Sequence, residues 1–262
     1  MNQPKFSGID GKRVLITGAT TGLGFAMAKA LAAANARVLV TGRDQTRVDS
    51  AVSALRRVSP EVMGSVMDVR DENSISQVLE RMAQAWAGVD VLVNNAGIGM
   101  QTVNPHFFTD PMPFWDIPTE KFRDLIDTNL TGYFLAAKKA APFFIKQGGG
   151  RIINITTSLE TMRRKGFVPY GPSRAASEAL SHIMAEDLKP FGITVNLLLP
   201  GGATSSAMVP DDIPSNIRSQ LLPADIMADP ILFLCSDASK GVNDERIIAK
   251  DFPQWLAGRV SN

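Results

Sequence analysis

The sequence predicts an α/β fold in which helices cover both faces of a doubly wound parallel sheet of about seven strands. Short runs rich in Val, Ile and Leu alternate with longer segments of helical periodicity, a pattern typical of parallel sheets wrapped by helices. A glycine-rich turn joins the first run to the first helical segment. The expected strands span residues 14–17, 38–41, 64–69, 89–93, 151–156, 194–199 and 246–250.

The composition fits a single domain over residues 1–262, because a chain of this length with 45% hydrophobic residues can bury a substantial core. A formal net charge of +1 without a basic block gives no electrostatic reason to expect nucleic acid or an anionic membrane as a partner. No long apolar run or apolar leader is present. We therefore expect a cytoplasmic protein, and a single cysteine, which cannot form an internal disulfide, suits a reducing compartment. This cysteine, Cys235, lies in an apolar run and is expected to be buried.

The connections between strands indicate where a ligand would bind, because the carboxyl ends of parallel strands lie at one edge of the sheet. Two proline-containing segments, at about 99–118 and 202–223, follow strands at that edge and are predicted to line a substrate pocket. A long helix is expected from about Glu120 to the glycines that begin at Gly148. His106 and His182 lie in separate segments, and no spacing of Cys, His and carboxylate residues suggests zinc, so no metal site is predicted.

The first strand runs into a glycine turn of spacing G-x-x-x-G-x-G, formed by Gly18, Gly22 and Gly24. Glycine lets the backbone approach a pyrophosphate closely, and the free N–H groups at the start of the next helix favour its negative charge. We therefore predict a dinucleotide site. Its candidate residues are Gly18, Thr20, Thr21, Gly22, Leu23 and Gly24.

The residue after the second strand predicts which dinucleotide binds. An acidic side chain there accepts hydrogen bonds from the ribose of NAD, whereas a basic side chain pairs with the 2′-phosphate of NADP. The chain has Arg43 at this position, and Asp44 is expected to cap the following helix. The predicted cofactor is therefore NADP(H).

Tyr170 and Arg174 are the candidate proton-transfer pair. A tyrosine has an unperturbed pKa of about 10. Lowering that pKa to near neutrality requires a shift of about 3 pKa units, which corresponds to ~4 kcal/mol. A cation about 4 Å away at an effective dielectric constant of ~20 supplies ~4 kcal/mol. The two residues are four positions apart at the start of a predicted helix, which puts them on one face within reach of each other.

The order of three motifs resembles the short-chain dehydrogenase/reductase family along nearly the whole chain: the glycine turn, residues 94–97 (Asn-Asn-Ala-Gly) and residues 170–174 (Tyr-Gly-Pro-Ser-Arg). The resemblance implies a Rossmann-type fold and hydride transfer between NADP(H) and a carbonyl or secondary alcohol, with Tyr170 as acid or base. The family has lysine where this chain has Arg174. Arginine keeps the charge but does not readily release a proton, so we expect retained cofactor binding with weakened or altered catalysis.

The same resemblance assigns further residues. A hydroxyl orients the substrate oxygen; counting thirteen residues back from Tyr170 favours Thr157, whereas residue type favours Ser158, and both stay open. Asn129 matches an asparagine that holds a relay water, and Asp68 is either an adenine contact or a helix cap. The other implied cofactor contacts are Val69, Asn95, Ala96, Gly97, Pro200, Gly201, Ala203 and Thr204, with Ser205 and Ser206 as alternative hydroxyls to Thr204.

The substrate is less well defined. Phe114 and Trp115, in the segment of 99–118, are predicted to form an apolar lid over the nicotinamide, and packing against a neighbouring subunit is an equal alternative. By resemblance we expect a homotetramer or homodimer. Two other functions compete with the reductase: a catalytically weak NADP-binding sensor, kept open by Arg174, and an isomerase or dehydratase with tightly held NAD, which Arg43 disfavours.

Overall fold

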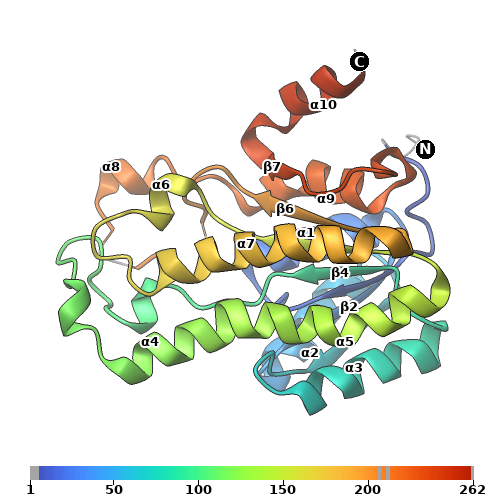
Figure 1. Cartoon of the computed structure of the whole chain (residues 1–262), viewed down its shortest axis with the longest axis horizontal. Coiled ribbons are helices and arrows are strands. Elements are labelled where there is room, and N and C mark those ends of the chain that lie inside the picture. Colours follow the sequence, from blue (N-terminus) through green and yellow to red (C-terminus); the bar gives the residue numbers. More distant parts are fainter. Residues whose placement is uncertain (1–5, 206–207, 211–212, 261–262) are drawn as a thin grey trace.

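A computed structural model describes residues 6–205, 208–210 and 213–260. Seven strands form one parallel sheet in the order β3-β2-β1-β4-β5-β6-β7. The predicted doubly wound α/β sheet is therefore confirmed (Figure 1). The strands are β1 Arg13–Ile16, β2 Arg37–Gly42, β3 Val62–Val66, β4 Val91–Asn94, β5 Gly150–Ile155, β6 Ile193–Leu199 and β7 Arg246–Ile248.

The strand bounds shift by one or two residues from the predicted ones in most strands, and the carboxyl ends of two strands shift the most. The third strand ends at Val66 rather than at residue 69, because its only neighbour, β2, ends opposite it at Gly42 and offers no further ladder partner. The seventh strand ends at Ile248, and residues Ala249–Asp251 form a 3-10 turn whose Lys250 N–H donates to the Pro200 carbonyl at 3.2 Å. The predicted strand lengths overshoot at the two edges of the sheet, where pairing is available on one side only.

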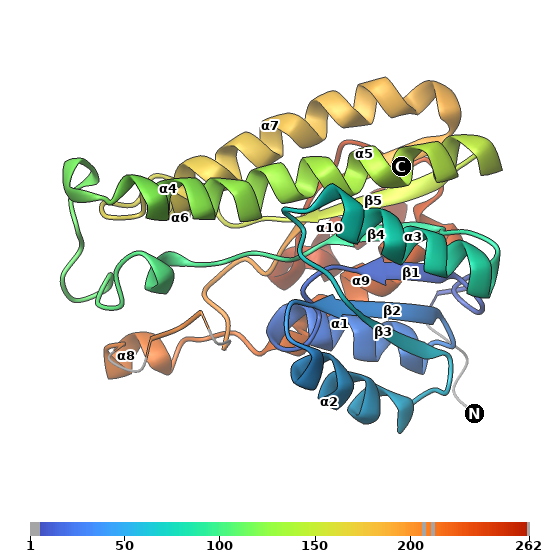
Figure 2. The ribbon, with the colours of Figure 1, turned by 90° about the horizontal axis from the view of Figure 1, so that it is seen from below.

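The helices lie in two layers (Figure 2). Alternate residues of β1 point to opposite faces: Val14 and Ile16 pack with one layer, and Leu15 packs with the other. The first layer contains α1 Gly22–Ala33, α2 Gln45–Arg56, α9 Ala228–Cys235 and α10 Phe252–Val260. The second contains α3 Glu72–Trp86, α5 Gly132–Gln147 and α7 Tyr170–Leu188. Among the described helices, none is long and apolar enough to cross a membrane.

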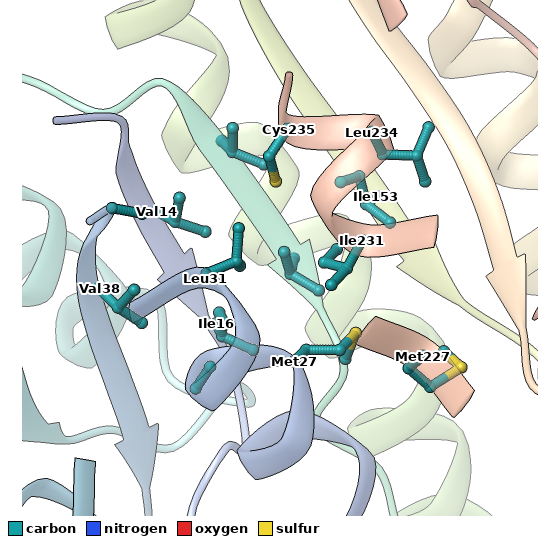
Figure 3. Packing of buried hydrophobic residues seen from close by; sticks show 14 of the residues in the cluster. Val14, Ile16, Met27, Leu31, Val38, Ile153, Met227, Ile231, Leu234 and Cys235 are labelled. Carbon is teal, nitrogen blue, oxygen red and sulfur yellow. The ribbon is translucent and has the colours of Figure 1, made fainter. Parts of the chain in front are cut away.

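The core beneath α1 and α9 includes the lone cysteine (Figure 3). Cys235 is fully buried, and this burial raises the pKa of its thiol to about 12. The thiol is therefore protonated and inert at neutral pH, and the predicted packing role is confirmed. Residues around it in this cluster include Val14, Met27, Leu31, Ile231 and Leu234.

The long helix expected from Glu120 to Gly148 is present but is not regular throughout. It consists of α4 Thr119–Ile126, a π-helical turn at Asp127–Thr131 and α5. It ends at Gly148, whose φ of 77° lies in the left-handed region that favours glycine. The π turn carries Asn129 and turns its side chain into the interior, where it is fully buried.

Candidate active site

The glycine turn lies between β1 and α1. Gly18 has a φ of 61°, and a Cβ atom there would lie 2.7 Å from the Cα of Ala96. A Cβ atom at Gly24 would collide with the side-chain amide of Asn95. Thr21 occupies the N-cap position of α1 without capping it through its side chain. The start of α1 thus combines close backbone approach with uncapped N–H groups, as a pyrophosphate site needs.

The Asn-Asn-Ala-Gly segment lies directly against this turn. The hydroxyl oxygen of Thr17 accepts hydrogen bonds from the N–H groups of Asn95 and Ala96, at 3.0 and 2.9 Å. The Asn95 side-chain amide donates to the carbonyls of Thr17 and Gly18, both at 2.9 Å. The structure therefore brings these two motifs together, and the Asn95 amide holds the turn in shape.

Arg43 is exposed immediately after β2, and Asp44 caps α2 by accepting the Arg47 N–H at 2.8 Å, as predicted. Asp68 accepts hydrogen bonds from the side chain and backbone of Arg70, and these bonds lower the pKa of its carboxyl, with a smaller contribution from the charge of Arg43. The alternative in which Asp68 caps a helix is wrong: α3 begins after Asp71, which accepts the Asn73 N–H.

Tyr170 is the first residue of α7, and Arg174 follows one turn later. The Arg174 guanidinium is 3% exposed and lies between two phenol rings, with its Cζ atom 5.4 Å from the ring centroids of both Tyr170 and Tyr133. Its Nη1 donates to the Tyr133 hydroxyl at 2.8 Å and to the Ile155 carbonyl at 3.0 Å. The four-residue spacing thus places a fixed cation against the Tyr170 ring.

The charge of Arg174 is maintained despite burial. Desolvation acts to lower its pKa, but the oxygens of Tyr133 and Tyr170 outweigh desolvation, so its pKa is raised. Burial raises the pKa of the Tyr133 phenol, although Arg174 opposes this change. Tyr133 therefore stays neutral and donates to the Ile155 carbonyl at 3.1 Å while it accepts from Arg174. Sequence reasoning missed Tyr133; its position four residues after Asn129 on the same helix was the available signal.

One donor of Arg174 has no protein partner. Its Nε is buried and makes no hydrogen bond to any residue that the structure describes. A buried donor of this kind is costly unless a ligand accepts from it. On the other side of the guanidinium, a Cβ atom at Gly97 would collide with Nη2 of Arg174. The site therefore offers a charged donor beside a backbone without a side chain, which suits the ribose hydroxyls of a dinucleotide.

Asn129 connects the end of β4 to α7. Its Oδ1 accepts the Ile98 N–H at 2.8 Å, and its Nδ2 donates to the Ile98 carbonyl at 2.9 Å and to the Ser173 hydroxyl at 3.4 Å. The asparagine thus holds the segment after Gly97 next to the turn of α7 that carries Arg174. Residues from three distant parts of the sequence meet here.

The two candidate hydroxyls differ in their surroundings. Ser158 is the N-cap of α6 Leu159–Met162; its Oγ accepts the Thr161 N–H at 3.2 Å and pairs with the Thr161 hydroxyl at 2.9 Å. Thr157 is half-buried, and its hydroxyl makes no hydrogen bond with the described residues. Of the two hydroxyls, that of Thr157 is therefore the one without a hydrogen-bond partner among the described residues.

The Pro-Gly turn after β6 is also formed. Gly201 has a φ of 91°, and a Cβ atom there would lie 2.6 Å from the Ile248 side chain. Thr204 is buried and forms an isolated parallel bridge with Leu222, whereas Ala203 is exposed. Ser206 lies outside the described residues. The turn leads from the sheet into the second proline-containing segment.

Phe114 and Trp115 lie in a 3-10 turn, 67% and 72% exposed, and contact each other edge to face at 5.2 Å. Phe107 and Phe108 of this loop both contact Phe167, with ring centroids 5.4 and 6.4 Å apart. The Phe167 ring in turn lies 6.4 Å from that of Tyr170. When several aromatic residues lie in one loop, the sequence does not show which of their side chains will pack toward the site.

His182 lies away from Tyr170 and Arg174 and pairs with a carboxylate near β7. His182 pairs with Asp244 at 2.5 Å on the outer side of α7. Over residues 6–205, 208–210 and 213–260, no group of three His, Cys, Asp or Glu side chains is placed to hold a metal ion. The described chemistry at this edge of the sheet is therefore carried by phenol, guanidinium, hydroxyl and amide groups.

Comparison with known proteins agrees with this geometry. The family model described as short chain dehydrogenase matches residues 12–214. Gluconate 5-dehydrogenase of Gluconobacter oxydans is 30% identical over 77% of this chain and 75% of its own length. The FabG 3-oxoacyl-acyl-carrier-protein reductase of Escherichia coli is 31% identical, covering 91% and 95% of the two chains.

A solved structure shares the fold over nearly its full length. The 3-ketoacyl-(acyl-carrier-protein) reductase from Brucella melitensis, complexed with NADH, superposes with a TM-score of 0.81 at 25% identity, covering 92% of this chain and 97% of that one. The names of these proteins describe dehydrogenases and reductases, and the Brucella melitensis reductase was solved with NADH. The chain therefore belongs to the short-chain dehydrogenase/reductase family.

Proposed function

We propose that this chain catalyses NADP(H)-dependent hydride transfer to a carbonyl, or from a secondary alcohol. The proposal depends on the buried guanidinium of Arg174, which lies against the Tyr170 ring and whose Nε has no hydrogen-bond partner among the residues that the structure describes. When bound, the nicotinamide supplies or accepts the hydride. The residues of this chain bind and orient the reactants and move one proton at the substrate oxygen.

In the direction of reduction, the Tyr170 hydroxyl gives its proton to the oxygen of the carbonyl as that oxygen gains negative charge. Arg174 stabilises the phenolate that remains, because it is a permanent cation in a site shielded from solvent. Its guanidinium does not release a proton near neutral pH, so its role is electrostatic and ligand-binding. Thr157 donates a hydrogen bond to the same substrate oxygen, and Asn129 supports a water that returns the proton to Tyr170.

The residues around the cofactor site fit a dinucleotide. Gly18 and Gly24 leave the backbone open beside the uncapped start of α1, and Arg174 offers Nε to the ribose next to the nicotinamide. The other proposed contacts surround these groups at the carboxyl edge of the sheet. They are Thr20, Thr21, Gly22, Leu23, Asp68, Val69, Asn95, Ala96, Gly97, Pro200, Gly201, Ala203 and Thr204.

Arg43 is the proposed determinant of NADP preference. Charge-assisted hydrogen bonds contribute about 1.5–3 kcal/mol, so Arg43→Ser should weaken NADPH binding by roughly 10- to 100-fold and leave NADH binding nearly unchanged. Fluorescence titration with both cofactors measures the two dissociation constants. Arg57→Ser, at the far and exposed end of α2, is the matched control. A native protein that binds NADH as tightly as NADPH would contradict the assignment.

Thr157 rather than Ser158 is the proposed substrate-orienting hydroxyl. Thr157→Val removes the hydroxyl at nearly constant shape and should lower kcat by roughly 10²-fold, the effect of losing one donor to a developing oxyanion. Ser158→Ala removes a helix cap and should cost about 1 kcal/mol of stability with little change in kcat. Steady-state kinetics and thermal unfolding of both variants test this assignment, and the reverse pattern would transfer the role to Ser158.

An oligomeric, cytoplasmic enzyme is part of the same proposal. Apolar side chains are exposed along α4, α5 and α7, where a second subunit would cover them. Phe114 and Trp115 remain candidates for a lid or for a subunit contact, since both are exposed. The exposed residues on the helices are Phe122, Phe134, Ile145 and Ile183.

A further inference from the structure

We infer that Arg246 and Glu178 form a brace that sets the position of Thr157 relative to Tyr170, which makes Arg246 a positioning residue for the reaction. The inference rests on the proposed function, in which Thr157 and Tyr170 act on the same substrate oxygen. Arg246 begins β7, at the far edge of the sheet from β3. It lies beyond residues 12–214, the part of the chain that matches the family model.

The brace consists of three connected contacts. The Nε of Arg246 donates to both carboxylate oxygens of Glu178 at 3.1 Å, and its Nη2 donates to the Thr157 carbonyl at 2.8 Å. Glu178 in turn accepts a hydrogen bond from the Thr156 hydroxyl at 2.8 Å. One guanidinium and one carboxylate thus hold two consecutive residues at the end of β5.

The brace begins at the residue that follows the last hydrogen bond between β5 and β6. The Thr156 N–H donates to the Leu198 carbonyl at 3.0 Å, which continues the β5–β6 ladder one residue beyond Ile155. Thr157 follows this last ladder bond, and the chain then turns into α6 at Ser158. The hydrogen bond from Arg246 to the Thr157 carbonyl therefore holds the chain directly after strand pairing ends. It does so at the residue whose hydroxyl is proposed to orient the substrate.

The other end of the brace is fixed to the helix that carries the proton donor. Tyr170, Arg174 and Glu178 follow one another at intervals of four residues and so lie along one face of α7. The Glu178 side chain is only 10% exposed, and that of Arg246 is 25% exposed. A partly buried ion pair adds little net stability in itself, but its geometry is well defined. Here it links the Thr157 turn to the face of α7 that presents Tyr170.

Arg246→Met tests the brace. It should lower kcat by roughly 10- to 100-fold, because misplacement of an orienting group by about 1 Å has effects of that size. The NADPH dissociation constant should stay within about twofold, since the hydrogen bonds of the Arg246 side chain go to Glu178 and Thr157 and not to Arg43, Gly18 or Arg174. Arg246→Lys keeps the charge beside Glu178 and should recover part of the lost kcat. Arg259→Met is the matched control, because it removes another arginine–carboxylate pair of the C-terminal region, with Glu245 at 2.6 Å.

Glu178→Gln provides a second variant that preserves side-chain shape if Arg246→Met folds poorly. It should lower kcat in the same direction, and the two substitutions combined should lower kcat by less than the product of their separate effects, since both disrupt one unit. Independent effects that multiply, or a full native kcat in both single variants, would overturn the inference.

A measurement without substrate separates this inference from the proposed function. Backbone amide exchange over residues 155–158 should be about tenfold faster in Arg246→Met, the effect of losing one charge-assisted hydrogen bond, while exchange in α7 stays unchanged. If the native protein reduces no carbonyl compound, the proposed function fails, and the exchange data still decide whether the brace holds Thr157. Unchanged exchange over these residues would refute the brace even in an active enzyme.

Discussion

Tyr170→Phe should lower kcat by roughly 10²- to 10⁴-fold, because it removes the group that exchanges a proton with the substrate oxygen. The ring remains, so its contacts with Phe167 and with the Arg174 guanidinium are kept, and NADPH should bind as in the native protein. Turnover with a panel of ketones, aldehydes and diketones, measured by NADPH absorbance beside a cofactor titration, gives both quantities.

The chain has two tyrosines, so Tyr133→Phe serves as the matched comparison. Tyr133 lies on the other side of Arg174 and accepts a hydrogen bond from its Nη1, but Arg174 keeps the Ile155 carbonyl as a partner when that hydroxyl is removed. We expect kcat to fall roughly tenfold, because the variant loses the one hydrogen bond between Arg174 and the Tyr133 hydroxyl. A larger loss in Tyr133→Phe than in Tyr170→Phe would show that the proton donor has been misassigned.

Arg174→Met should reduce kcat/KM by roughly 10³-fold, since a cation near the reacting phenol contributes ~4 kcal/mol. The substitution also leaves the Tyr133 hydroxyl without its donor and removes the Nε offered to the cofactor, so NADPH affinity should fall as well. Kinetics and cofactor titration separate the two losses. A variant that keeps the native kcat/KM would exclude an electrostatic role for Arg174.

Arg174→Lys is the charge-preserving companion. Lysine can release and take up a proton, whereas arginine does not, so we expect NADPH binding to persist and kcat to exceed the native value. Both bonds to Tyr133 and Ile155 come from Nη1 of Arg174, and an ammonium also has enough donors to make two bonds, but lysine has no counterpart of the Nε donor. An unchanged kcat would show that arginine rather than lysine at this position has no catalytic consequence. Turnover in this variant with none in the native protein would favour the NADP-binding sensor.

The features that sequence reasoning predicted well depend on local geometry. Alternation of strand and helix periodicity predicted the parallel sheet, and the Asp44 cap followed from the residue types at a helix start. The contact between Tyr170 and Arg174 followed from four-residue spacing on one helix. Strand ends were less well predicted, because β3 ends where its neighbour does and that neighbour is not visible in the local sequence.

The hydrogen bonding that distinguishes Ser158 from Thr157 is visible only in the folded chain. Counting and residue type favoured different hydroxyls, and the difference between them emerged from the capping bond that Ser158 makes to Thr161. The same holds for Tyr133 and Arg246, whose functional contacts are made with residues 41 and 89 positions away in the sequence. The chain's own residues determined the sheet, the glycine turn and the Tyr–Arg pair, because torsional preferences and helical spacing act over a few residues. Packing between distant segments decides the hydrogen bonding of the two hydroxyls, the partners of Arg174 and the contacts at the Thr157 turn. Such contacts exist only after the helices have docked on the sheet.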